Sequence, residues 1–219
     1  MKPFLIPLLL ALSAVSFLRG GAAEQPASDV PARAVKISFL PPPMEGTISL
    51  GIYDKKGKLV RALHREAEID DFTAGQDALR TSWDGKDDAG EAAAAGTYSA
   101  RGFVVGDLNI GDPEEAPPDK LNSGEKVKVK LVANPLNGDV RSTIEVIAGL
   151  DEDASFLATT DGLPLYTVDE APGLMRVSLT QRPDRSLDLI EDDGDSVEQY
   201  HITGAEKMMA FDCGEFELK

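Results

Sequence analysis

The chain has 219 residues, 42% of them hydrophobic and 27% charged, which allows one ordinary domain or two small ones behind a leader. Its formal net charge of −16 argues against proteins that hold nucleic acid or anionic lipid on a basic surface. Cys213 is the one cysteine, so an internal disulfide is excluded. A reactive free thiol and a disulfide between two chains are both possible. Because cysteine side chains are most often buried, a buried and inert thiol is favoured.

Residues 1–23 are expected to be a secretory signal peptide. Lys2 gives a positive start, residues 4–18 are mostly apolar, and small residues at 21–23 suit a cleavage site. The apolar run is shorter than the roughly 20 residues of a membrane-spanning helix, and no later segment is apolar enough. We therefore expect export to the periplasm, the cell surface or the medium. Removing the leader with Lys2 and Arg19 makes the net charge −18.

A first all-β domain is predicted at residues 35–105, after a flexible segment at 24–34. DKKG at 54–57 is predicted to be a hairpin turn, and the alanines of 91–96 are too few to nucleate a helix. Alternating apolar residues indicate a small antiparallel sandwich. Its predicted strands are VKISFL (35–40), TISLGIY (47–53), KLVRALH (58–64), ALRTSW (78–83) and GTYSARGFVV (96–105).

Residues 106–125 are acidic and proline-rich, which predicts a linker or long loop before a second all-β module at 126–219. This module could be a second small sandwich or a propeller-blade-like piece. A propeller needs at least four blades, more than the remaining length supplies. A truncated propeller would have exposed strand edges, so a homo-oligomer stays an open alternative. Its predicted strands are VKVKLVA (127–133), STIEVIAG (142–149), SFLATT (155–160), LPLYTV (163–168), LMRVSLT (174–180), SLDLI (186–190), VEQYHIT (197–203) and KMMAFD (207–212).

Three motifs of the first domain fall in a recognisable order. They are I-Y-D-x-x-G-x-L-V-R-x-L at 52–63, W-D-G-x-D-x-x-G at 83–90 and G-x-Y at 96–98. Over about residues 35–105 the chain resembles the Ig-like domain first described in the flagellar hook-capping protein, the FlgD-type Ig-like fold. The resemblance implies an assembly or accessory module without catalytic residues. A secretory leader conflicts with hook capping itself, and suits the large secreted bacterial proteins that also carry this module.

The motif residues themselves favour structural roles. Trp83 ends an inward-facing run and is expected to anchor the core. Asp84 can accept hydrogen bonds from backbone amides just ahead of it, and Tyr98 can bury its ring while its hydroxyl reaches the backbone. Glycines at the turns permit positive φ. The motif residues to which we assign these roles are Trp83, Asp84, Gly85, Asp88, Gly90, Gly96 and Tyr98.

The acidic loops raise the question of calcium. An EF-hand-type loop needs oxygen ligands at alternate positions and glycine at the sixth. A loop starting at Asp84 has Lys86 and Ala89 at the third and sixth positions, and one starting at Asp151 has Phe156 at the sixth. Residues 191–196 also lack the spacing. Solvated turn carboxylates are the favoured interpretation, with an irregular Ca²⁺ site left open.

Other chemistry lacks its pattern. His64 and His201 are the only histidines, with no metal-binding spacing, and they are expected on a strand surface or satisfied in the core. The sequence has no G-x-S-x-G, no P-loop and no dinucleotide fingerprint. We therefore expect no catalytic residues and no cofactor.

The sequence thus favours a non-enzymatic, exported structural or binding module of a bacterial envelope or secreted protein, used in adhesion, scaffolding or as an accessory domain. Its partner would be a protein or a glycan, with no nucleic acid. A carbohydrate-binding accessory protein is one alternative, although only 6% of the residues are aromatic. A propeller enzyme fragment completed by oligomerisation is another.

Overall fold

The computed structural model describes residues 33–117, 121, 126–137 and 142–219, so the predicted signal peptide lies outside the described residues. The described part contains sixteen strands and two 3₁₀ turns, Ile69–Asp71 and Pro135–Asn137, and no α-helix. All strand pairs are antiparallel, which confirms the predicted all-β class. Short alternating runs separated by glycine- and aspartate-rich turns account for this architecture.

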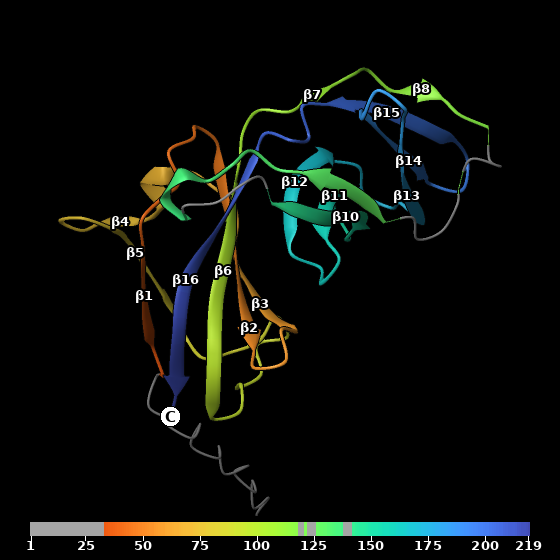
Figure 1. Cartoon of the computed structure of the whole chain (residues 1–219). Coiled ribbons are helices and arrows are strands. Elements are labelled where there is room, and N and C mark those ends of the chain that lie inside the picture. The colour runs from red at the N-terminus through yellow and green to blue at the C-terminus, as the bar shows by residue number, and fades with distance from the viewer. Residues whose placement is uncertain (1–32, 118–120, 122–125, 138–141) are drawn as a thin grey trace, which may run out of the picture. The chain divides into compact units, whose positions relative to one another are not determined.

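The N-terminal sandwich consists of two sheets (Figure 1). Their buried side chains form one core that is rich in aromatic residues. The apolar alternation of the sequence places Ile48, Leu50 and Ile52 in this core from one side and Ile37 and Phe39 from the other. The strands of the first sheet are, in order, β1 (Val35–Phe39), β5 (Leu79–Trp83) and β4 (Thr73–Ala74). Those of the second are β16 (Met208–Leu218), β6 (Gly96–Val105), β2 (Thr47–Asp54) and β3 (Leu59–Ala67).

The last strand belongs to the N-terminal sandwich. β16 runs antiparallel beside β6, from Met208 opposite Val105 to Leu218 opposite Gly96 (Figure 1). Phe211 and Leu218 enter the same core as Trp83. This differs from the expected second module at 126–219, because the apolar pattern of KMMAFD predicts a strand but not its partner. The C-terminal sandwich is therefore inserted between two neighbouring strands of the N-terminal one.

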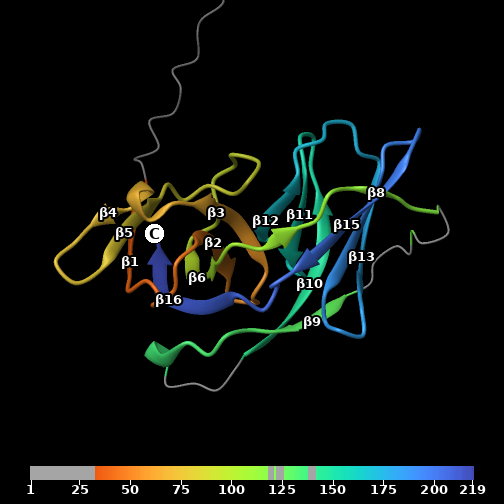
Figure 2. The same ribbon diagram turned by 90° about the horizontal axis from the view of Figure 1, so that it is seen from above.

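The C-terminal sandwich is built from two further sheets that share an aliphatic core. β10 lies against β13, and Figure 2 shows the two sheets side by side. Both sheets contribute to one buried cluster, so this half is a sandwich and not a propeller blade. The strands are β12 (Pro164–Asp169), β11 (Ser155–Thr159), β10 (Thr143–Leu150) and β9 (Val127–Lys130) in one sheet, and β13 (Arg176–Gln181), β14 (Leu187–Asp192), β15 (Val197–Thr203) and β7 (Asn109–Ile110) in the other.

The segment expected to be a linker, 106–125, contributes strands where the structure describes it. β7 pairs with β15 through Ile110 and Ile202, and β8 (Glu114–Glu115) pairs with the start of β15. Leu108 and Ala116 are buried. Isolated apolar residues in a proline-rich acidic stretch gave no strand signal, yet they suffice to cover the edge of a sheet.

The second face of β2 is buried as well as the first. Ser49 is 0% and Tyr53 2% exposed, although the alternation placed only the isoleucines and Leu50 toward a core. This face lies against the C-terminal sandwich, where β12 contacts β2, β3 and β6. The described chain from Arg33 onward falls within one compact unit, and no helix in its described part has the length and apolar character to cross a membrane.

A bulge in β3 joins the two sandwiches. Glu66 adopts φ 45°, and its carboxylate accepts hydrogen bonds from the amide and the hydroxyl of Thr167 at 2.8 and 2.5 Å. Its neighbour Arg65 lies 2.9 Å from Asp151. Left-handed backbone at a non-glycine residue costs free energy, so packing on both sides must hold it. The bulge re-aims one side chain of β3 toward β12.

Candidate functional site

The Trp83 loop is occupied by structural contacts. Trp83 is 0% exposed, and its Nε1 donates to the Lys86 carbonyl at 2.7 Å. The Asp84 carboxylate accepts the Lys86 amide at 3.0 Å, as an Asx turn does. Gly85 and Gly90 have φ of 76° and 80°, in the region that favours glycine. These contacts form a turn around a buried indole.

The remaining motif residues are held in the same way. The Asp88 carboxylate accepts the Ala62 amide of β3 at 3.0 Å and lies 3.8 Å from the Arg61 guanidinium. Tyr98 packs its ring 5.0 Å from that of Trp83 and donates its hydroxyl to the Ala94 carbonyl at 2.7 Å. Gly96 begins β6. The motif carboxylates thus bind backbone groups of their own loop and of β3.

The two histidines lie in separate places and make local contacts. His64 Nε2 lies 2.7 Å from the Thr81 hydroxyl, and burial lowers the pKa of this imidazole. His201 Nδ1 lies 3.0 Å from Asp188. Cys213 is half-buried, and burial raises its pKa to about 12, which keeps the thiol protonated and unreactive near neutral pH. Among the described residues, no three His, Cys, Asp or Glu side chains are grouped to hold a metal ion.

β14 carries three buried carboxylates, a feature that the sequence did not reveal. Asp188 is paired with Arg182 at 2.8 Å and also meets His201, and Asp192 is paired with Arg176 at 2.5 Å. Glu191, 3% exposed, accepts a hydrogen bond from the Ser155 hydroxyl instead of meeting a cation. Two of the three carboxylates are therefore neutralised by partners and the third is not.

The environment of Glu191 disfavours its ionised form. Burial, together with the nearby carboxylates of Asp169 and Glu198, raises the pKa of Glu191 to about 7. The hydrogen bond from Ser155 acts in the opposite direction and lowers this pKa, but by less. Burial also raises the pKa of Tyr200, which donates its hydroxyl to Asp169. Residues around Glu191 line a cavity of about 100 Å³, which is too small for most ligands.

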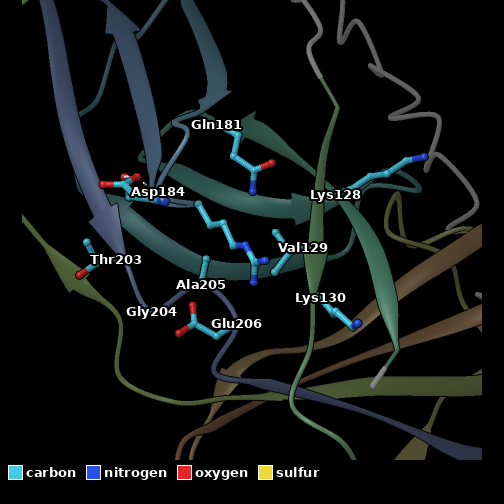
Figure 3. Close-up of a pocket in the computed structure, with 11 residues that line it drawn as sticks. Lys128, Val129, Lys130, Gln181, Asp184, Thr203, Gly204, Ala205 and Glu206 are labelled. Carbon is cyan, nitrogen blue, oxygen red and sulfur yellow. Dashed lines mark hydrogen bonds between the residues drawn. The ribbon is translucent and has the colours of Figure 1, made fainter. Parts of the chain in front are cut away.

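A wider groove of about 710 Å³ runs beside β9 (Figure 3). One wall is Lys128, Val129 and Lys130 of β9, and the opposite wall includes Gln181 and Asp184 at the β13–β14 turn. Figure 3 shows Val129 and Ala205 facing its middle, with Glu206 on one side and Gln181 on the other. Its volume is that of a binding site rather than of a packing defect. Its complete lining is Lys128, Val129, Lys130, Gln181, Asp184, Arg185, Ser186, Thr203, Gly204, Ala205 and Glu206.

β9 is the edge strand of its sheet, with β10 as its one neighbour in the described chain. The Leu131 amide donates to Ser142 at 2.7 Å, so the backbone groups of Val129 also face β10 and those of Lys128 and Lys130 face the groove. Sequence reasoning identified this strand but not the groove. The signal was the run K-V-K-V-K at 126–130, where lysines alternate with valines in an acidic chain.

Comparison of the chain with protein-family models, with curated proteins and with solved structures found no match. The resemblance to the hook-capping-type Ig-like domain therefore rests on the motif residues alone.

Proposed function

We propose that this chain is a non-enzymatic, exported binding module of a bacterial envelope or secreted protein, used for adhesion or scaffolding. The observation that carries the proposal is the groove of about 710 Å³ beside the edge of β9 that no described strand pairs with. Such a groove offers a partner both a row of backbone groups and side chains of either charge.

The placement of the acidic residues supports this assignment. The carboxylates of Asp84 and Asp88 are bonded to backbone amides, and those of Asp188 and Asp192 to arginines. These four carboxylates stabilise turns and strands of the fold. The predicted leader and the resemblance of residues 35–105 to an accessory domain support an exported role of the same kind.

A protein partner fits better than a glycan. Glycan sites present exposed aromatic rings, and here Trp83, Tyr53 and Tyr98 are at most 7% exposed. Phe103, Tyr166 and Phe216 are half-buried, and no aromatic ring of the described residues is fully exposed. Backbone groups along a strand edge suit a polypeptide instead. The charge of the chain favours partners that are not nucleic acids.

The test is a pull-down with the mature chain, residues 24–219, from envelope and culture extracts, followed by mass spectrometry and glycan analysis. We expect a saturable polypeptide partner that excess unlabelled chain displaces. A hydrolytic or transfer activity that copurifies with the chain and disappears in Glu191→Gln or His201→Ala would contradict the proposal. A matched array of bacterial glycans distinguishes the carbohydrate alternative.

A further inference from the structure

We infer that the edge of β9 left open by the described residues binds an extended acidic segment of a partner protein, which adds to the sheet as an antiparallel neighbour of β9. This inference rests on the proposed binding function and names its partner class.

The backbone of β9 is prepared for such an addition. The amides and carbonyls of Lys128 and Lys130 point away from β10, and no backbone group in the described ranges is bonded to them. Two residues after Lys130, the Val132 amide donates to the carbonyls of Glu206 and Met208 at 3.2 and 3.1 Å. A later segment of the same chain therefore already occupies this edge at Val132, and within the described residues the edge is free at Lys128 and Lys130.

The charges of the edge select the partner. β10 places Glu145 directly opposite Lys128, and the carboxylate of Glu145 lies 3.8 Å from the ammonium of Lys126. A strand on the open side would place its own side chains opposite Lys128 and Lys130 on the same face. Neither of these lysines forms an ion pair within the described part of the chain. Glutamate or aspartate at alternate positions of the partner would repeat the pairing that β10 makes.

The same charges disfavour a second copy of this chain as the occupant. If β9 paired with β9 of another copy, lysines would lie opposite lysines, which is destabilising. Lysines on an edge strand are a known protection against self-pairing. Here Lys128 and Lys130 disfavour pairing of β9 with a neutral or basic strand, whereas an acidic strand can still pair with it. Arg185, on the far wall of the groove, adds a third cation without an ion pair in the described residues.

The probe is a fluorescein-labelled heptapeptide of alternating threonine and glutamate, measured by fluorescence anisotropy against the mature chain. We expect binding that weakens with added salt. Lys128→Glu with Lys130→Glu should weaken it by about tenfold or more, a change of ~1.4 kcal/mol or more. The control is Lys55→Glu with Lys56→Glu, the same charge change at the exposed β2–β3 hairpin, with an effect below ~2-fold. Circular dichroism checks that each variant is folded.

A second probe separates strand addition from charge attraction. Residues opposite Lys128 and Lys130 would direct their own amides toward β9, so N-methylation of the glutamates removes those donors and keeps the charge. We expect the methylated peptide, and a peptide with lysine for glutamate, not to bind. Equal binding of the methylated peptide, equal binding of an acidic polysaccharide, or no effect of the lysine reversals overturns the inference.

Sedimentation tests the remaining occupant. If the chain forms a dimer that dissociates when Lys128 and Lys130 are changed to glutamate, β9 pairs with β9 of a second copy. This result also overturns the inference. The outcome is separable from that of the proposed function. If the reversed variant still captures the same partner from extracts, the chain is a binding module whose partner uses another surface.

Discussion

The two sandwiches fill their cores with different kinds of side chain. The N-terminal core is aromatic: Phe39 meets Phe72 edge-to-face and stacks on Phe211, and the rings of Trp83 and Tyr98 form a tilted pair. The C-terminal core consists mainly of leucine and valine, with Tyr200 as the one aromatic residue in its described buried cluster. Large rings fill a core with few residues, whereas an aliphatic core of this kind needs more strands.

The two regions also differ in their buried polar groups. The N-terminal sandwich buries Ser49, on the face of β2 toward the C-terminal sandwich, but no carboxylate among its described residues, while β14 alone buries Asp188, Glu191 and Asp192. Buried charges stabilise a fold only when partners compensate for the lost hydration. The comparison teaches that the N-terminal sandwich is held by packing, whereas the C-terminal one also depends on ionisation.

The strongest test of this comparison removes β16 by ending the chain at Lys207. The N-terminal core would lose Phe211 and Leu218, each worth about 2–5 kcal/mol, together with its ladder to β6. That loss is comparable with the whole stability of a domain, about 5–15 kcal/mol. We expect emission of Trp83, the one tryptophan, to shift to that of a solvated indole. Removal of Lys219 alone is the control, and unchanged emission of the shorter chain would contradict this account.

The next test asks whether the two cores unfold together. Trp83→Ala should destabilise by about 3–5 kcal/mol and Leu189→Ala by about 2–5 kcal/mol, because both side chains are 0% exposed. Since the described chain falls in one compact unit, Leu189→Ala should shift urea unfolding followed by Trp83 fluorescence. An unmoved Trp83 transition would show that the sandwiches unfold independently.

A smaller effect tests the role of ionisation at Glu191. Its pKa is raised from 4.5 to about 7 in the folded chain, so folding favours the protonated form. The associated stability is fully present below pH 4.5 and is lost as the pH rises through 7. Glu191→Gln should therefore stabilise the chain at pH 8 by a few kcal/mol and change little at pH 4. Urea unfolding at both pH values measures this.

The control for Glu191 is Glu152→Gln, which removes an equal charge from an exposed turn. If both variants gain the same stability at pH 8, the effect comes from the net charge of the chain and not from burial of Glu191.

The smallest expected effect concerns the acidic loop after Trp83. Asp88→Ala removes the acceptor of the Ala62 amide and should cost about 1 kcal/mol. Asp77→Ala, at an exposed position, should change the free energy of unfolding by less than ~0.5 kcal/mol. Chemical unfolding distinguishes the two. An equal, negligible effect would mean that the Asp88 contact does not stabilise the loop.

Much of the fold could be predicted because its signals are local. In the DKKG turn, the Gly57 amide donates a hydrogen bond to the Asp54 carbonyl at 2.9 Å. This is the hairpin turn expected between two runs of alternating apolar residues. Trp83 was expected in a core and is fully buried, and the Tyr98 hydroxyl does reach the backbone. Each of these depends on residues close together in the sequence.

The missed features depend on distant residues. Nothing in KMMAFD indicates that Met208 lies opposite Val105, and nothing in SLDLI indicates that Glu191 meets Ser155 across the core. The groove also depends on distant residues, since Lys128 and Gln181 line one groove only after two sheets have packed. Alternation predicts which side chains share a face, but it does not tell which strand or loop that face will meet.

The return of β16 to β6 also sets an order of events during synthesis. A chain that leaves a ribosome or an export channel from its N-terminus presents β2, β3 and β6 long before β16 emerges. All the inserted strands, β7 to β15, emerge before β16, so the C-terminal sandwich is complete before the sheet of β6, β2 and β3 receives its last strand. Pairing across so long a loop is slow, so the N-terminal sheet would stay open until the last residues arrive. Such a delay keeps the aromatic core unformed until β16 has emerged.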